Sequence, residues 1–163
     1  MRIRRWRLSL LVAILSATAL FHSAKGDTVL VRDGKSEVRI LVDSGAPAPV
    51  WDGISTLRHY IREISGAELQ VDPDSSWSGP QIIVEVGASG DPEMHLNALG
   101  IDGFRIKTVN RDLVFTAMTG DGFQNAVYTF LETYLGCRKY SDQVEVVPRS
   151  PTISLPAIDD TQV

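Results

Sequence analysis

Cys137, the chain's single cysteine, is the residue best suited to nucleophilic chemistry, and it follows a helix-like run that ends at Gly136. A reactive thiolate needs a nearby base and an electropositive setting. Arg138 and Lys139 are adjacent in sequence, but a strand at 137–140 would place only Lys139 on the same face as the cysteine. Free cysteine is also among the residue types most often buried. We therefore predict that Cys137 packs in the core, and one cysteine cannot form an internal disulfide.

Histidines and acidic residues offer the next possible chemistry, as metal ligands. His59 and His95 are far apart, and neither has a second ligand at the spacing of a zinc site. Asp72 and Asp74 begin a stretch similar to a calcium loop, but Trp77 occupies the position where that loop needs glycine. We therefore predict no metal site.

The sequence Gly120-Asp121-Gly122 precedes a helical pattern and is similar to a phosphate-binding turn. The third glycine of the dinucleotide motif is missing, because Asn125 stands there. No spacing selects two carboxylates as the acid and base of a glycosidase pair. We therefore predict no catalytic residue and no cofactor-binding residue in this chain.

Residues 1–26 are typical of a secretory signal peptide. Four arginines precede a 14-residue, largely apolar run at 8–21, and small residues follow, among them Ala24 and Gly26. The apolar run is shorter than the roughly 20 residues of a spanning helix, so an uncleaved anchor is the less favoured alternative. We expect an exported protein, periplasmic or extracellular, with no stable membrane anchor.

The remaining residues, 27–163, are expected to form one globular domain. The composition is ordinary for such a domain, with 44% apolar and 22% charged residues. Residues 1–26 contain five of the sixteen basic residues and none of the twenty acidic ones. The remaining residues therefore have eleven bases and a net charge of −9. This acidic body argues against a nucleic-acid partner and against binding to an anionic membrane surface.

Two β-rich segments with turn signals predict hairpins. The first places strands at 28–32 and 37–42 around an Asp-Gly-Lys turn, because glycine accepts the positive φ of a tight turn. The second lies within 102–118 and turns at Asn110. Further strands are predicted at 81–87, 137–140, 144–147 and 152–155.

Two segments have the periodicity of amphipathic helices. The first starts near Val50 and ends at Gly66, with one apolar face formed by Val50, Ile54, Leu57, Ile61 and Ile64. The second occupies about 122–136, ends at Gly136, and has an apolar face formed by Phe123, Val127, Phe130, Leu131, Tyr134 and Leu135. The predicted fold is α+β, with one mixed β-sheet and both helices packed on one of its faces.

Several of these runs resemble a known domain. They are AVYTFLETYLGCRKY, ISGAEL, IIVEVG and DGFRIKTVNRDLVFTA. The similarity as a whole covers nearly all of residues 28–156. The chain resembles the N-terminal accessory domain of bacterial glycoside hydrolases, of the family 67 α-glucuronidase and family 20 β-N-acetylhexosaminidase type. Lys139 departs from the usual pattern, which has tryptophan after Leu-Gly-Cys-Arg.

The resemblance implies a non-catalytic role. In such enzymes this domain precedes a (β/α)8 barrel that carries the catalytic carboxylates, and a barrel takes roughly 250 residues. We expect an accessory domain of an exported glycoside hydrolase involved in polysaccharide breakdown, a truncated or split product with its barrel in cis or trans. The alternative is an independent module that binds carbohydrate through Trp51 or Trp77. A self-contained small hydrolase is the least favoured interpretation.

Overall fold

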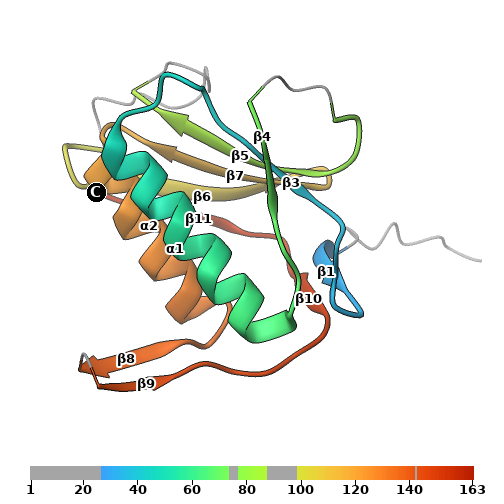
Figure 1. Cartoon of the computed structure of the whole chain (residues 1–163). Helices are drawn as coiled ribbons and strands as arrows, with labels where there is room; N and C mark the ends of the chain where they lie inside the picture. Colours follow the sequence, from blue (N-terminus) through green and yellow to red (C-terminus); the bar gives the residue numbers. More distant parts are fainter. Residues whose placement is uncertain (1–26, 74–76, 88–98, 142) are drawn as a thin grey trace, which may run out of the picture.

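The computed structural model describes residues 27–73, 77–87, 99–141 and 143–163; the predicted signal peptide lies outside them. The described residues form a six-stranded sheet in the order β11-β6-β7-β5-β3-β4 (Figure 1). Strand β6 is antiparallel to both of its neighbours, whereas β7, β5, β3 and β4 are mutually parallel. These strands are β3 (Arg39–Leu41), β4 (Gln70–Asp72), β5 (Gln81–Val86), β6 (Phe104–Val109), β7 (Asp112–Ala117) and β11 (Asp159–Gln162).

Two helices, α1 (Ala48–Ser65) and α2 (Gly120–Thr133), lie side by side on one face of this sheet, as predicted (Figure 1). Glycines allow the close approach of their N-terminal turns. A Cβ on Gly53 of α1 would lie 2.7 Å from the Phe123 ring, and one on Gly120 of α2 would lie 2.7 Å from Pro49. Because the N-terminal turns meet, the two helices run in the same direction. None of the described helices is long and apolar enough to cross a membrane.

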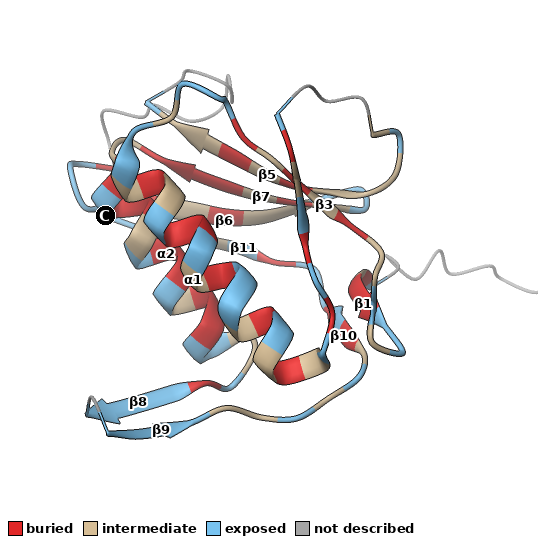
Figure 2. Cartoon of the chain, in the orientation of Figure 1, coloured by how far each residue is buried: buried red, intermediate tan, exposed pale blue. Residues whose placement is uncertain are grey.

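The core lies between the helices and the sheet (Figure 2). Phe115 of β7 makes edge-on ring contacts with two phenylalanines of α2, at centroid distances of 5.9 Å to Phe123 and 5.4 Å to Phe130. All three rings are fully buried. Burial of each such ring contributes roughly 1.5–3 kcal/mol, so this cluster is a main source of stability.

The predicted first helix is confirmed. Its five apolar residues are all buried, and Pro49 lies in the first turn, where a missing N–H costs nothing. Gly66 ends the helix at φ +79° and donates its N–H to the Arg62 carbonyl at 2.8 Å. A left-handed residue at this position satisfies carbonyls that the helix end would leave without partners.

The prediction of one sheet and of a continuous strand at 37–42 is wrong. The hairpin itself exists, but β2 (Lys35–Ser36) pairs with β1 (Thr28–Arg32), which also pairs with β10 (Ile153–Leu155) in a separate three-stranded sheet. The chain then turns into β3. The Ser36 hydroxyl donates to the Val38 carbonyl at 2.7 Å and accepts the Val38 N–H at 3.3 Å. This local turn competes with strand pairing and divides the segment.

Strands β4 and β11 were not predicted, because their polar residues give no alternating pattern. The second helix ends at Thr133, before Gly136, although Gly136 does have the expected left-handed φ of +73°. A two-stranded hairpin, β8 (Arg138–Ser141) with β9 (Val144–Val146), forms the third sheet.

Candidate interaction surface

Most of the exposed large apolar side chains lie at two places next to α2, a groove beside this helix and the hairpin that follows it. Three of them, Ile101, Tyr128 and Val163, belong to or border a groove beside α2. Three more lie on the β8–β9 hairpin that follows α2: Tyr140, Val144 and Val146. Within the described part of the chain, the other exposed large apolar side chain is Val109, at the end of β6.

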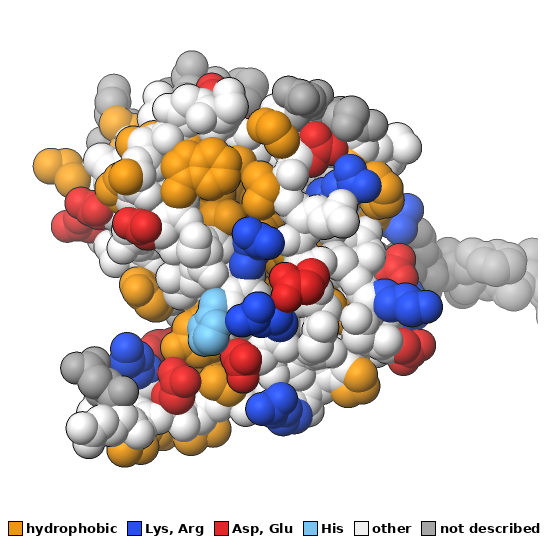
Figure 3. Space-filling view, in the orientation of Figure 1, with side chains coloured by type: hydrophobic (Ala, Val, Ile, Leu, Met, Phe, Trp, Pro, Cys, Tyr) orange, Lys and Arg blue, Asp and Glu red, His pale blue; other side chains and the backbone are white. Residues whose placement is uncertain are grey.

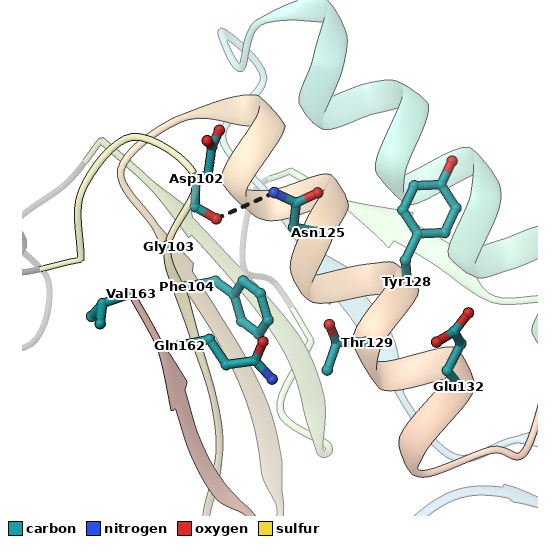
Figure 4. A pocket seen from close by; sticks show the side chains of 9 residues that line it. All are labelled: Asp102, Gly103, Phe104, Asn125, Tyr128, Thr129, Glu132, Gln162 and Val163. Carbon is teal, nitrogen blue, oxygen red and sulfur yellow. Dashed lines mark hydrogen bonds between the residues drawn. The ribbon is translucent and has the colours of Figure 1, made fainter.

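The groove lies between α2 and the adjoining β6 and β11 strands (Figure 4). Its volume is about 340 Å³. The helix supplies Asn125, Tyr128, Thr129 and Glu132, whose spacing places them on one face. The opposite side consists of Asp102, Gly103 and Phe104 with Gln162 and Val163 of the C-terminal segment. Its rim is therefore acidic and its wall partly apolar.

The segment before β6 is held firmly against the start of α2. Thr119 donates its hydroxyl to the Ile101 carbonyl at 2.7 Å, and the Asn125 amide donates to the Asp102 carbonyl at 3.3 Å (Figure 4). A Cβ on Gly103 would lie 1.8 Å from the Leu99 carbonyl oxygen, so only glycine fits there. The groove wall is thus fixed by backbone packing.

The described strand residues of the β8–β9 hairpin are all exposed (Figure 2). It is tied to α1 by Tyr60, which donates its hydroxyl to the Glu145 carboxylate at 2.9 Å. Partial burial, and then this hydrogen bond to Glu145, raise the pKa of Tyr60 to about 12. The hairpin therefore has a fixed attachment but exposed strands.

Cys137 lies between α2 and this hairpin and is buried, with 4% of its surface exposed. Its N–H donates to the Leu131 carbonyl at 2.9 Å. Burial raises the pKa of the Cys137 thiol, and the nearby Glu145 carboxylate raises it further, whereas Arg138 lowers it. Both leading effects favour the neutral thiol. The prediction that Cys137 packs in the core is confirmed.

The other residues considered for chemistry lie apart from this surface. His59 is exposed on α1, and Asp72 is buried beside Arg39. His95 and Asp74 lie outside the described residues. Among the residues that the structure describes, no group of three His, Cys, Asp or Glu side chains is placed to hold a metal ion.

The glycines in the first turn of α2 have a packing role. Gly120 lies against Pro49, and a Cβ on Gly122 would lie 2.8 Å from the Gly103 carbonyl oxygen. The Gly122 N–H is already bonded to the Thr119 hydroxyl at 3.1 Å, the N-cap contact of α2. Close contact with α1 therefore accounts for Gly120, and close contact with the segment before β6 accounts for Gly122.

Both tryptophans of the described chain are half-buried. The Trp51 indole N–H donates to the Ala46 carbonyl at 3.0 Å, and that of Trp77 donates to the Pro80 carbonyl at 3.0 Å. The Arg39 guanidinium lies 4.5 Å from the centre of the Trp77 ring. Sequence reasoning did not select Tyr128, although a large aromatic residue outside the apolar face of a predicted helix was a usable signal.

No family model matches this chain, and no curated protein matches its sequence. Its fold is similar to parts of solved glycosidases. One is a GH20 β-N-acetylhexosaminidase from Streptomyces coelicolor A3(2), with a TM-score of 0.53 and 19% identity over 83% of this chain and 23% of that chain. The N-acetyl-β-hexosaminidase of Streptomyces plicatus gives a TM-score of 0.50 and 18% identity over 82% and 22%.

A family GH115 4-O-methyl-α-glucuronidase with specificity for decorated arabinogalactans is also similar, with a TM-score of 0.53 and 13% identity over 84% of this chain and 18% of that chain. The chain thus spans about a fifth of the length of these three proteins. At such identities the likeness concerns the fold alone. It supports the resemblance to a domain of glycoside hydrolases and does not select one family.

Proposed function

We propose that this chain is a non-catalytic accessory domain of an exported glycoside hydrolase and that it docks on a catalytic domain through the α2 groove and the β8–β9 hairpin. The observation that carries the proposal is the concentration of exposed apolar side chains there. Contiguous apolar patches on a soluble domain commonly mark an interface with a partner.

The fold comparisons support a catalytic domain as the partner. The similar structures are glycosidases in which this fold takes up 18–23% of the chain, so most of each protein lies outside it. We infer that a catalytic (β/α)8 domain, in cis or in trans, is the occupant of this surface. We also propose that the enzyme is an α-glucuronidase or a hexosaminidase that acts in polysaccharide breakdown.

The chemistry of the surface suits a protein partner. Tyr128 and Tyr140 are 51% and 72% exposed, and large aromatic side chains are common anchors in interfaces. Asp102 and Glu132 border the groove, so a complementary partner would present arginine or lysine opposite them. An apolar centre with a charged rim is the usual layout of a stable interface.

The test is co-expression of the full chain with a catalytic barrel encoded in the same operon or reading frame. Size-exclusion chromatography with light scattering should show a one-to-one complex. Tyr128→Ser and Val146→Thr should each weaken it by about tenfold or more, as loss of a central contact does. Val109→Thr is the matched control, because this exposed valine lies at the end of β6, outside the groove lining and outside the β8–β9 hairpin. No complex, or equal weakening by the control, would contradict the proposed docking.

The non-catalytic part of the proposal has its own test. The purified chain alone should hydrolyse neither aryl glucuronides nor aryl N-acetylhexosaminides. Turnover that follows the purified protein and disappears when one of its own carboxylates is changed would instead support a self-contained hydrolase.

A further inference from the structure

A second surface, on the exposed side of α1, is lined by polar and charged side chains. Ser55, Arg58, His59 and Arg62 share one face of the helix and, with Glu68, border a depression of about 200 Å³. A neighbouring depression of about 340 Å³ is lined by the β1–β2 hairpin and the strands beside it, with Lys35, Arg39, Gln70 and Trp77 among its residues. Glu68 borders both depressions, so they adjoin.

This double depression is a basic region on an acidic protein. It contains four of the eleven lysines and arginines in residues 27–163, whereas Glu68 is the one carboxylate among the described residues that line it. Figure 3 shows lysine and arginine side chains over α1 and the adjoining segments of this side, with acidic side chains between them. A local excess of positive charge on a body of net charge −9 selects for an anionic ligand.

The cations differ in how far they are neutralised. Arg39 pairs with the buried Asp72 at 3.5 Å, and Arg62 pairs with Glu68 at 3.3 Å. The Lys35 side chain has no ion pair or hydrogen bond to another residue within the described part of the chain. Arg58 donates its Nε–H to the Leu69 carbonyl at 2.9 Å, which holds the guanidinium in place without neutralising its charge. Lys35 and Arg58 are therefore the cations available to a ligand.

The polar groups between them are suited to hydroxyls. Gln70 supplies an amide with donors and acceptors, and the Arg62–Glu68 pair presents a planar donor group beside an acceptor. Trp77 adds an aromatic ring to the wall; the Arg39 guanidinium lies over one face of this ring, and the indole N–H donates to the Pro80 carbonyl. An apolar ring surface beside planar polar groups is the environment that a sugar ring fits, because a sugar has apolar faces and a hydroxyl rim.

We propose that the double depression binds an oligosaccharide that carries carboxylate groups. Lys35 and Arg58 pair with the carboxylates, while Gln70 and Trp77 contact the sugar ring. This binding is independent of the proposed docking, because it uses α1 and the β1–β2 hairpin and not the α2 groove. Failure of one proposal therefore leaves the other standing.

The experiment uses the full chain with Trp6→Phe and Trp51→Phe, in which Trp77 is the single tryptophan. Its fluorescence is followed during titration with trigalacturonate, with a neutral trisaccharide of the same length, and with a sulfated trisaccharide. We expect saturable binding of trigalacturonate with Kd of roughly 0.1–1 mM, in the range of weak specific ligands. The affinity should fall with added salt, because exposed charges are screened.

Two variants and a control locate the site. Lys35→Gln and Arg58→Gln should each weaken binding several-fold, and Arg58→Lys should lie between Arg58→Gln and the parent, because lysine keeps the charge without the planar fork. Lys139→Gln, on the β8–β9 hairpin and outside the lining of both depressions, should leave affinity unchanged. Melting curves of each variant verify folding.

Four outcomes would overturn the proposal. They are no saturable change in fluorescence or calorimetric heat, equal affinity for the neutral trisaccharide, much tighter binding of the sulfated one, and an equal loss in Lys139→Gln.

Discussion

The β6–β7 and β8–β9 hairpins are both antiparallel, but they differ in burial. In β6–β7, alternate residues such as Ile106, Leu113 and Phe115 are fully buried against the helices. In β8–β9 every described strand residue is exposed, Tyr140 and Val146 among them (Figure 2). An apolar residue in the first hairpin therefore stabilises this domain, whereas one in the second is available to another molecule.

The difference shows how one domain can separate stability from interaction. Removal of a buried side chain loses both its transfer free energy and its packing contacts. Removal of an exposed side chain changes little in the isolated chain, because no neighbouring residue loses a contact. Substitutions of buried residues in β6–β7 should therefore lower the free energy of unfolding. Substitutions of exposed residues in β8–β9 should instead weaken partner binding.

The largest expected effect is that of Phe115→Ala in β7. Phe115 contacts Phe123 and Phe130 and has no exposed surface, so the substitution creates a cavity in the central cluster. We expect the free energy of unfolding to fall by about 3–5 kcal/mol. Urea denaturation followed by circular dichroism measures it. Phe115→Leu, which keeps most of the volume, should cost clearly less; equal losses would show that the cavity is not the cause.

A smaller effect is expected at the junction between α2 and the exposed hairpin. Cys137→Ala removes a small buried side chain and should lower the free energy of unfolding by about 1 kcal/mol. Thiol labelling should be slow in the folded chain and fast in denaturant, since the side chain is buried and its pKa is raised. Rapid labelling of the folded chain would mean that the junction opens readily.

How far the sequence predicts these regions depends on periodicity. The buried face of α1, with Ile54 and Leu57, follows from the 3.6-residue repeat, and the β6–β7 hairpin follows from alternation around its turn. Strand β11, with Asp159 and Gln162, has no apolar pattern, since its place depends on pairing with β6. The groove was not predictable for the same reason. It needs α2 next to the C-terminal strand, and that is a tertiary arrangement.

The attachment of the hairpin should give a pH dependence. The pKa of Tyr60 is raised from 10.0 to about 12 in the folded chain, so folding favours the protonated phenol. This contribution is complete below pH 10 and is lost as the pH rises through about 12. Tyr60→Phe should therefore show a weaker loss of stability between these values than the parent. Melting curves across this range decide it, and identical slopes would contradict the role of the Tyr60–Glu145 bond.

The smallest effect on stability is expected for Tyr140→Ser in β8. Its side chain is 72% exposed, and it lies on a hairpin whose strand residues are all exposed, so the free energy of unfolding should change by less than about 0.5 kcal/mol. Binding to a catalytic domain should nevertheless weaken, because an aromatic anchor is lost from the proposed interface. Denaturation and light scattering on the same sample separate the two quantities. A loss of stability as large as that of Cys137→Ala, with unchanged binding, would place Tyr140 in the domain's own packing. The contrast between the two hairpins would then fail.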